Sequence, residues 1–197
     1  MSGIITQEPR EYRVADLVEV HHDKQEREPK ENAANNRAHP CEPYCVGMAG
    51  IQIVRGSIKD LDDLVPLFDD YRQFYGQRSD LTVARVFLGD RIERDESVVY
   101  LAYTGPREAA GFTQLYPSFS SVSLKPLWIL NDLYVRSDVR RGGVGRALLE
   151  RARQHALETG AKGLVLSTGV MNKPAQTLYE SCGWRRDDEF SQYHLFF

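Results

Sequence analysis

The chain has 197 residues, 42% hydrophobic and 27% charged, which is the composition of a one-domain globular protein. Its formal net charge of −3 comes from the first 50 residues, so the neutral remainder offers no broad basic face for nucleic acid. No stretch approaches the roughly 20 apolar residues of a membrane helix, and the polar start lacks the apolar centre of a secretory signal. We therefore expect a cytoplasmic protein with neither a nucleic-acid nor a membrane partner.

Residues 1–48 differ from the rest in composition. The stretch HHDKQEREPKENAANNRAHPCEPYC has almost no apolar residues and cannot bury enough surface to offset the entropy of ordering it. We expect a mostly disordered tail over residues 1–48 and a single folded domain over residues 49–197. His39, Cys41 and Cys45 match no zinc spacing, so no metal site is expected.

From residue 50 the sequence predicts strands and helices in a legible order. IQIVRGS is a predicted strand, and apolar residues at helical spacing predict a helix over LDDLVPLFDDYRQFYG. SDLTVARVFLGDRIER predicts a second helix, capped by Ser79 or Asp80. Three strands rich in β-branched and aromatic residues follow, over SVVYLAY, AAGFTQLYP and LWILNDLYV.

The last third begins with a glycine-rich loop, VRRGGVG, and a helix with Leu148, Leu149, Ala152, Ala156 and Leu157 on one face. GLVLSTG then predicts a strand, NKPAQTLYESCG a short helix, and WRRDDEFSQYHLFF a closing pair of strands. The whole order, β-α-α-β-β-β-α-β-α-β-β, indicates an α/β fold.

The glycine loop has two interpretations. Without side chains in the way, its backbone N–H groups can approach a phosphate at the start of a helix; alternatively, the glycines only permit tight packing. A P-loop needs Lys followed by Ser or Thr after Gly145, and a dinucleotide fingerprint needs glycine where Leu148 stands. Neither pattern is present.

The pattern that fits is Arg-x-x-Gly-x-Gly, formed by Arg140, Gly143 and Gly145 between a strand and a helix. Here the sequence resembles the GCN5-related N-acetyltransferase (GNAT) superfamily, in which this loop holds the pyrophosphate of acetyl-CoA. The family's second motif is similar to Asn172 followed by Ala175, then Leu178-Tyr179-Glu180 and Gly183-Trp184. The sequence LNDLYV…RRGGVG most resembles the polyamine/diamine acetyltransferase branch of the superfamily, although that branch usually has Glu in place of Asn131.

The resemblance covers about residues 51–197 and implies the GNAT fold: α/β, with a mixed, mostly antiparallel sheet whose splayed central strands are flanked by helices. Acetyl-CoA would lie in the splay between residues 127–135 and 164–168, without a metal. The residues that would contact it are Leu133, Tyr134, Val135, Arg140, Arg141, Gly142, Gly143, Val144, Gly145, Arg146, Ser167, Asn172, Ala175 and Tyr179.

Two side chains are candidates for proton transfer. Asn131 and Asp132 interrupt a strand otherwise fit for burial, and because successive strand residues point to opposite faces, only one should face the acceptor. Asp132 can take a proton and is the predicted base or amine-positioning group; a structural hydrogen bond is the alternative. The resemblance makes Tyr179 the general acid for the departing thiolate, and a core tyrosine is the alternative.

The resemblance implies that the acceptor binds at the first helix pair and the loop after the third strand. Carboxylates and aromatic side chains there suit a cation, although a solvated helix end and core aromatics explain them equally well. The candidate acceptor-binding residues are Asp70, Tyr71, Phe74, Tyr75, Tyr116, Asn131 and Asp132. We expect direct acetyl transfer to a primary amine of a polyamine-like molecule or amino acid. A protein lysine acceptor and a non-catalytic acyl-CoA sensor are the alternatives, and the resemblance leaves a homodimer as a further expectation.

Overall fold

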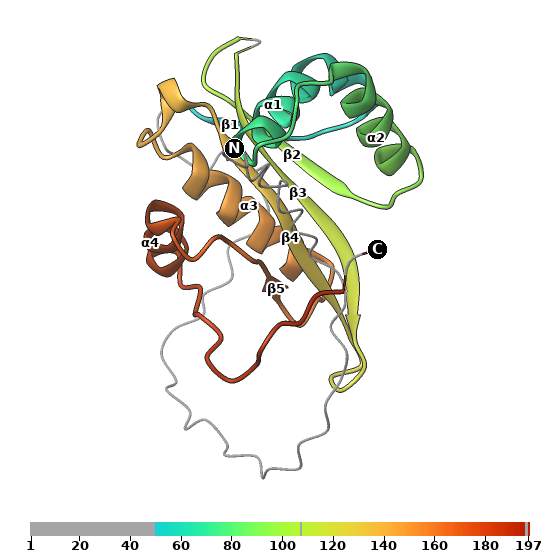
Figure 1. Ribbon diagram of the computed structural model, residues 1–197, viewed down its shortest axis with the longest axis vertical. Helices are drawn as coiled ribbons and strands as arrows, with labels where there is room; N and C mark the ends of the chain where they lie inside the picture. The colour runs from blue at the N-terminus through green and yellow to red at the C-terminus, as the bar shows by residue number, and fades with distance from the viewer. Residues whose placement is uncertain (1–49, 107, 196) are drawn as a thin grey trace, which may run out of the picture.

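The computed structural model describes residues 50–106, 108–195 and 197, so the predicted tail over residues 1–48 lies outside the described part of the chain. The strands are β1 (Gln52–Arg55), β2 (Val98–Tyr103), β3 (Ala109–Ser120), β4 (Lys125–Val135) and β5 (Leu164–Val165). The helices are α1 (Leu61–Phe74), α2 (Leu81–Glu93), α3 (Val144–Glu158) and α4 (Lys173–Ser181), with short 3-10 turns at Ile58–Asp60 and Ser137–Val139. The predicted order of strands and helices is therefore confirmed as far as α4 (Figure 1).

The strands form one sheet in the order β1-β2-β3-β4-β5. The first four strands are antiparallel, whereas β5 is parallel to β4. Only Trp128 with Leu164 and Ile129 with Val165 pair between β4 and β5. The mixed sheet is confirmed, and β4 has no pairing with β5 beyond Ile129, as a splay between the two requires. Within the described residues β5 is the edge strand, so the splay lies at the edge of the sheet and not between two central strands.

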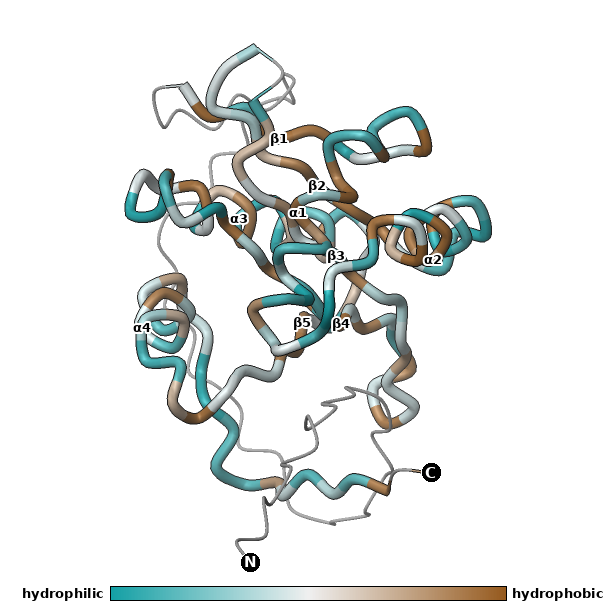
Figure 2. The backbone as a smooth tube through the Cα atoms, turned by 45° about the horizontal axis from the view of Figure 1, so that its top comes forward, coloured by the Kyte–Doolittle hydropathy of each residue, from teal (hydrophilic) through white to brown (hydrophobic). Residues whose placement is uncertain are grey.

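Helices cover both faces of the sheet (Figure 1). Helices α1 and α2 pack on one face over Leu101 and Phe112, and α3 packs on the other face over Leu115. Figure 2 shows the hydrophobic colouring along β2. Each fully buried Leu or Phe contributes roughly 1.5–3 kcal/mol relative to an exposed one. The two apolar layers therefore hold the sheet from both sides.

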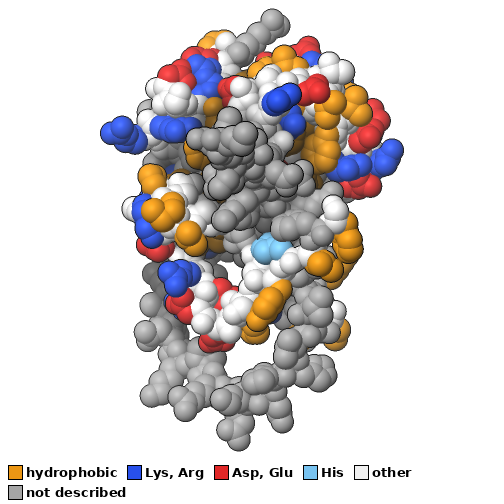
Figure 3. All heavy atoms as spheres, in the orientation of Figure 1, with side chains coloured by type: hydrophobic (Ala, Val, Ile, Leu, Met, Phe, Trp, Pro, Cys, Tyr) orange, Lys and Arg blue, Asp and Glu red, His pale blue; other side chains and the backbone are white. Residues whose placement is uncertain are grey.

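Apolar side chains are exposed on α3 and, in larger number, on α2. Leu157, predicted on the buried face of α3, is 59% exposed, because it follows the buried Leu148 by nine residues, which at about 100° per residue places it on the opposite side of the helix. On α2 only Ala84 and Leu88 are buried. Hydrophobic side chains are visible over α2 in Figure 3, and those exposed on this helix are Leu81, Val83, Val86 and Phe87.

A buried carboxylate fixes the corner between α1 and α2. Asp69, which is 2% exposed, accepts hydrogen bonds from the Ser79 hydroxyl at 2.6 Å, the Asp80 N–H at 2.8 Å and the Arg72 guanidinium at 3.2 Å. Burial alone would raise the pKa of Asp69, but these bonds bring it below the usual value. Asp80 in turn accepts from the Val83 N–H and caps α2, as predicted. The corner holds the end of α1 over the sheet.

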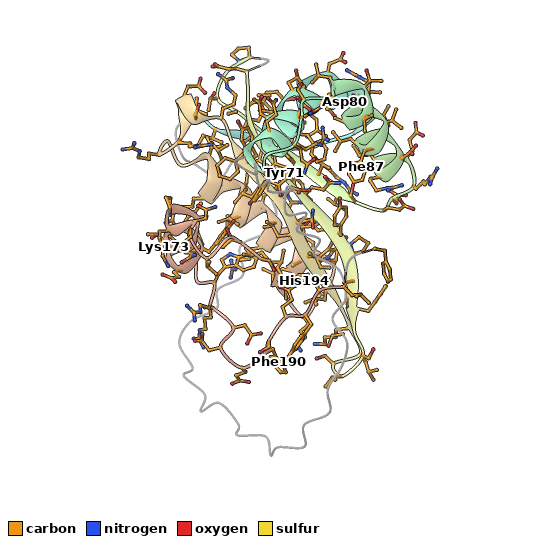
Figure 4. All side chains as sticks on the ribbon, viewed as in Figure 1. Tyr71, Asp80, Phe87, Lys173, Phe190 and His194 are labelled. Atoms are coloured by element: carbon orange, nitrogen blue, oxygen red, sulfur yellow. The ribbon has the colours of Figure 1, made fainter. Side chains whose placement is uncertain are left out.

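The predicted closing pair of strands over residues 184–197 is wrong for the part that the structure describes, where no strand follows α4. The Asp187 carboxylate accepts the N–H groups of Glu189 and Phe190 at 2.9 and 3.1 Å, so a local turn satisfies backbone donors that a strand would pair. Phe190 and Leu195 are 72% and 80% exposed, and Figure 4 shows Phe190 far from the helices that cover the sheet.

Candidate active site

The strand β4 is irregular at the predicted catalytic pair. Gln114 pairs with Asp132, but Leu115 pairs with Leu130, so Asn131 is an extra residue that forms a β-bulge. The two polar side chains lie together, and Asn131 Nδ2 donates to Asp132 Oδ1 at 3.0 Å. The expectation that Asn131 and Asp132 point to opposite faces is therefore wrong, because it assumed an unbroken strand.

Asp132 is a buried carboxylate. It is 3% exposed, and its Oδ2 has no hydrogen bond of standard geometry within the described residues, although the Tyr71 hydroxyl interacts with the group. Burial raises the pKa of Asp132 from 3.8 to about 6, and the interactions with Asn131 and Tyr71 oppose this rise. A carboxylate with a pKa near neutrality is suited to accept a proton from an amine.

Phenol groups gather around this carboxylate. Tyr71 and Tyr75 come from α1 and Tyr116 from β3, and Figure 4 shows Tyr71 where α1 meets the strands. Burial, with the Asp132 charge adding to it, raises the pKa of all three phenols, so they remain neutral. The rings of Tyr71 and Tyr75 pack edge to face at 5.1 Å. Three predicted acceptor-binding residues thus surround the predicted base.

A cavity of about 370 Å³ lies beside this cluster. It is lined by Phe74, Tyr75, Gly169, Met171, Asn172 and Pro174. Tyr75 also interacts electrostatically with Asp132, so the cavity and the carboxylate share this neighbour, although Asp132 does not line the cavity. Its size is in the range of small-molecule sites. Asp70, by contrast, is exposed and interacts with the Tyr134 phenol, so it lies apart from the cluster around Asp132.

Tyr179 reaches the same region from α4. It packs against the α3-side core, and its ring lies 6.1 Å from that of Trp184. Burial raises the pKa of Tyr179 to about 12; Tyr75 adds to this rise and a hydrogen bond with Thr168 opposes it. The phenol is therefore protonated at neutral pH, as an acid or hydrogen-bond donor must be. Since Tyr75 interacts with both Asp132 and Tyr179, the predicted base and acid lie in one cluster.

The loop between β4 and α3 has the shape of an anion cradle. Arg141 and Gly143 have φ angles of +65° and +91°, and such turns of the backbone let successive N–H groups converge on one point. Gly143 is the N-cap of α3 and provides no side-chain cap, so the first N–H groups of the helix have no intrahelical acceptor. A Cβ on Gly145 would lie 3.0 Å from Leu178, which shows how closely this loop approaches α4. The geometry fits a pyrophosphate.

The arginines of the loop differ in their contacts. Arg140 donates to the Val135 carbonyl at 3.0 Å, and Arg146 donates to the hydroxyl and carbonyl of Ser181 at 2.8 and 3.3 Å. Arg141 is exposed and makes no ion pair or hydrogen bond through its side chain with any residue that the structure describes. Arg141 is therefore the side chain most available to an anion, whereas Arg140 and Arg146 stabilise the loop.

The remaining predicted cofactor contacts border the splay. Leu133, Tyr134 and Val135 follow the last residue of β4 that pairs with β5, and Ser167 is exposed beyond the end of β5. Asn172 caps α4 by accepting the Ala175 N–H at 3.4 Å. Gly142 is exposed in the loop, whereas the Val144 side chain is 2% exposed in the core, so only its backbone is available.

Sequence reasoning missed Gln114. This side chain is fully buried opposite Asp132 and neither polar atom has a hydrogen-bond partner among the described residues. Thr113 and Gln114 interrupt the apolar run of β3 just as Asn131 and Asp132 interrupt β4, so the same signal was present in the sequence. Within the described ranges, no helix is long and apolar enough to cross a bilayer, and no three His, Cys, Asp or Glu residues form a metal-binding group.

Comparison with known proteins identifies the family. The model of the acetyltransferase (GNAT) family matches residues 61–184. An uncharacterized N-acetyltransferase, YhfO, of Bacillus subtilis is 45% identical over 145 residues, which cover 74% of this chain and 97% of the relative. A probable acetyltransferase of Haemophilus influenzae is 32% identical and covers 61% and 90% of the two chains. The crystal structure of a probable acetyltransferase superposes with a TM-score of 0.71 at 49% identity, covering 74% and 97% of the chains. The chain therefore belongs to the GNAT family of acetyltransferases.

Proposed function

We propose that this acetyltransferase transfers the acetyl group of acetyl-CoA directly to the primary amine of a small molecule, polyamine-like or an amino acid. The observation that carries the proposal is the buried Asp132 carboxylate, with its pKa raised to about 6, at the point where β4 bulges and leaves β5. Acetyl-CoA supplies the activated acetyl group as a thioester.

An amine must lose a proton before it attacks. Presenting a lysine-like amine of pKa about 10.4 in neutral form at pH 7 costs roughly 4–5 kcal/mol. Asp132 does not lower this equilibrium cost, since a carboxylate stabilises the ammonium. Its role is to hold the ammonium in place and to accept the proton as the amine attacks. Tyr71, Tyr75 and Tyr116 surround the carboxylate with neutral aromatic groups, which favour a cation and exclude water.

The depth of Asp132 favours a narrow acceptor. Because the carboxylate is 3% exposed and lies beside three tyrosines, a narrow aliphatic arm is best suited to reach it. The cavity of about 370 Å³ next to Tyr75 has room for the body of a small molecule, which supports a small acceptor. The four-carbon arm of a protein lysine is also narrow, so the assay with lysine peptides separates the two acceptors.

The other half of the reaction uses the loop and α4. The N–H groups at the start of α3 and the Arg141 side chain would bind the pyrophosphate of acetyl-CoA, and the unpaired edge of β4 at residues 133–135 would bind its pantetheine arm. Tyr179 would donate its phenolic hydrogen to the departing sulfur.

Release of CoA from acetyl-CoA, detected by a thiol-reactive dye, tests the proposal. The wild-type chain and Asp132→Asn are incubated with polyamines, amino acids, aminoglycosides and lysine peptides. We expect one class of small amine to stimulate release by the wild type, and Asp132→Asn to lose most of that stimulation. Stimulation by lysine peptides alone would replace the small acceptor with a protein. Binding of acetyl-CoA without release by any amine would support a non-catalytic sensor.

A further inference from the structure

The Gln114 side chain is an unexplained polar group next to the proposed base. It is 0% exposed, and neither Oε1 nor Nε2 has a hydrogen-bond partner among the residues that the structure describes. An unpaired amide in the interior is costly, and such groups are rare in folded proteins. Substituting an apolar side chain of the same size would remove this cost, so protein stability alone does not explain a glutamine here.

Gln114 and Asp132 are aligned on the same face of the sheet. They are register partners on β3 and β4 at the bulge. Phe112, two residues before Gln114, packs in the core cluster under α1 and α2, and alternation places Gln114 on that face. Asp132 faces α1 too, because it interacts with Tyr71. Asp132 Oδ2 also lacks a hydrogen bond of standard geometry, although the Tyr71 hydroxyl interacts with this carboxylate, so the two unpaired atoms of Gln114 lie opposite an incompletely bonded oxygen.

The chemistry of these three atoms defines a matching ligand. Asp132 Oδ2 and Gln114 Oε1 are acceptors, and an ammonium or amine group can donate to both. Gln114 Nε2 is a donor beside Oε1 in the same amide plane, so it requires an oxygen close to the amine. A simple alkylamine or polyamine provides no such oxygen, whereas an amino acid or an amino alcohol does.

We propose that Gln114 binds the acceptor and selects an amine with an oxygen on the neighbouring carbons, so that amino acids and amino alcohols are preferred to polyamines. This inference rests on the proposed function and narrows its substrate class. Gln114 takes no proton and forms no bond to the acetyl group. Asp132 takes one proton from the ammonium, and the neutral nitrogen then bonds to the acetyl carbon as the carbon–sulfur bond breaks. The sulfur receives the hydrogen of Tyr179, and the second proton that the nitrogen loses restores the Tyr179 phenol.

The experiment compares two sets of primary amines matched in length, with the wild type and with Gln114→Met. One set carries a hydroxyl or carboxylate oxygen close to the amine, and the other consists of alkylamines and diamines. We expect the wild type to show at least tenfold higher kcat/KM for the oxygen-bearing set, because a site built to hydrogen-bond an oxygen rejects analogues that lack it. Gln114→Met should reduce this ratio to near one, mainly by raising KM for the oxygen-bearing amines.

Two controls separate binding from folding. Leu115→Met changes the next buried side chain of β3 on the opposite face and should leave the ratio unchanged. The melting temperature of Gln114→Met should equal or exceed that of the wild type, since two unpaired polar atoms are removed. Equal use of both sets by the wild type, or an unchanged ratio in Gln114→Met, would overturn the inference and leave the acetyltransferase proposal standing. No turnover of either set by the wild type would overturn both.

Discussion

Replacing the buried carboxylate of Asp132 should stabilise the protein at neutral pH while it removes activity. Burial raises the pKa of Asp132 from 3.8 to about 6, and each unit corresponds to about 1.4 kcal/mol. As pH rises through this window, the unfolded chain releases the proton first, so the wild type loses roughly 3 kcal/mol of stability. Asp132→Asn does not titrate and keeps that stability, which corresponds to roughly 6–12 °C in melting temperature for a domain of this size.

Melting temperatures of the wild type and Asp132→Asn, measured from pH 4 to pH 8, test this reasoning. The difference should be small at pH 4, grow between pH 4 and pH 6 and then level off. Asp188→Asn, which changes a carboxylate that is 72% exposed, is the matched control and should show a flat difference. Over the same range, wild-type kcat/KM should fall about tenfold per unit below pH 6, because the base must be ionised. A difference that is constant with pH, or a less stable Asp132→Asn at pH 8, would refute the buried-carboxylate interpretation.

Three further outcomes are expected. Tyr179→Phe should lower kcat about 100-fold with little change in melting temperature, and normal turnover would show that the tyrosine is only part of the core. Gly143→Glu should raise KM for acetyl-CoA more than tenfold by placing a carboxylate at the cradle, whereas Gly160→Glu, at a glycine of φ +64° beyond the other end of α3, should not; equal effects would indicate backbone strain alone. His155 is 6% exposed, and burial with nearby Arg151 lowers its pKa, so stability should fall as pH drops below about 6.5. His155→Phe should reduce that fall in acid melting curves, and an identical fall would assign it to other groups.

Much of the fold could be predicted from short-range patterns in the sequence. The apolar spacing in residues 61–75 and the cap at Asp80 predict α1 and α2 because a helix buries one stripe and needs its first N–H groups satisfied. The prediction of closing strands was wrong because the Asp187 carboxylate accepts backbone N–H groups that a strand would pair with its neighbour. The spacing of apolar residues gives no sign of this competing hydrogen bonding.

The candidate site, like the fold, has features that the sequence predicts and features that it does not. The proposed base and the glycine cradle could be predicted from residue types and spacing, and the proposed acid from the resemblance to the family, since proton transfer and close backbone approach demand particular side chains at particular positions. The sequence could not predict that a bulge brings Asn131 against Asp132 or that Gln114 lies opposite without a hydrogen-bond partner among the described residues. Register and burial arise from contacts between strands far apart in the chain, and burial is what raises the pKa of Asp132 into the range where it can act as a base.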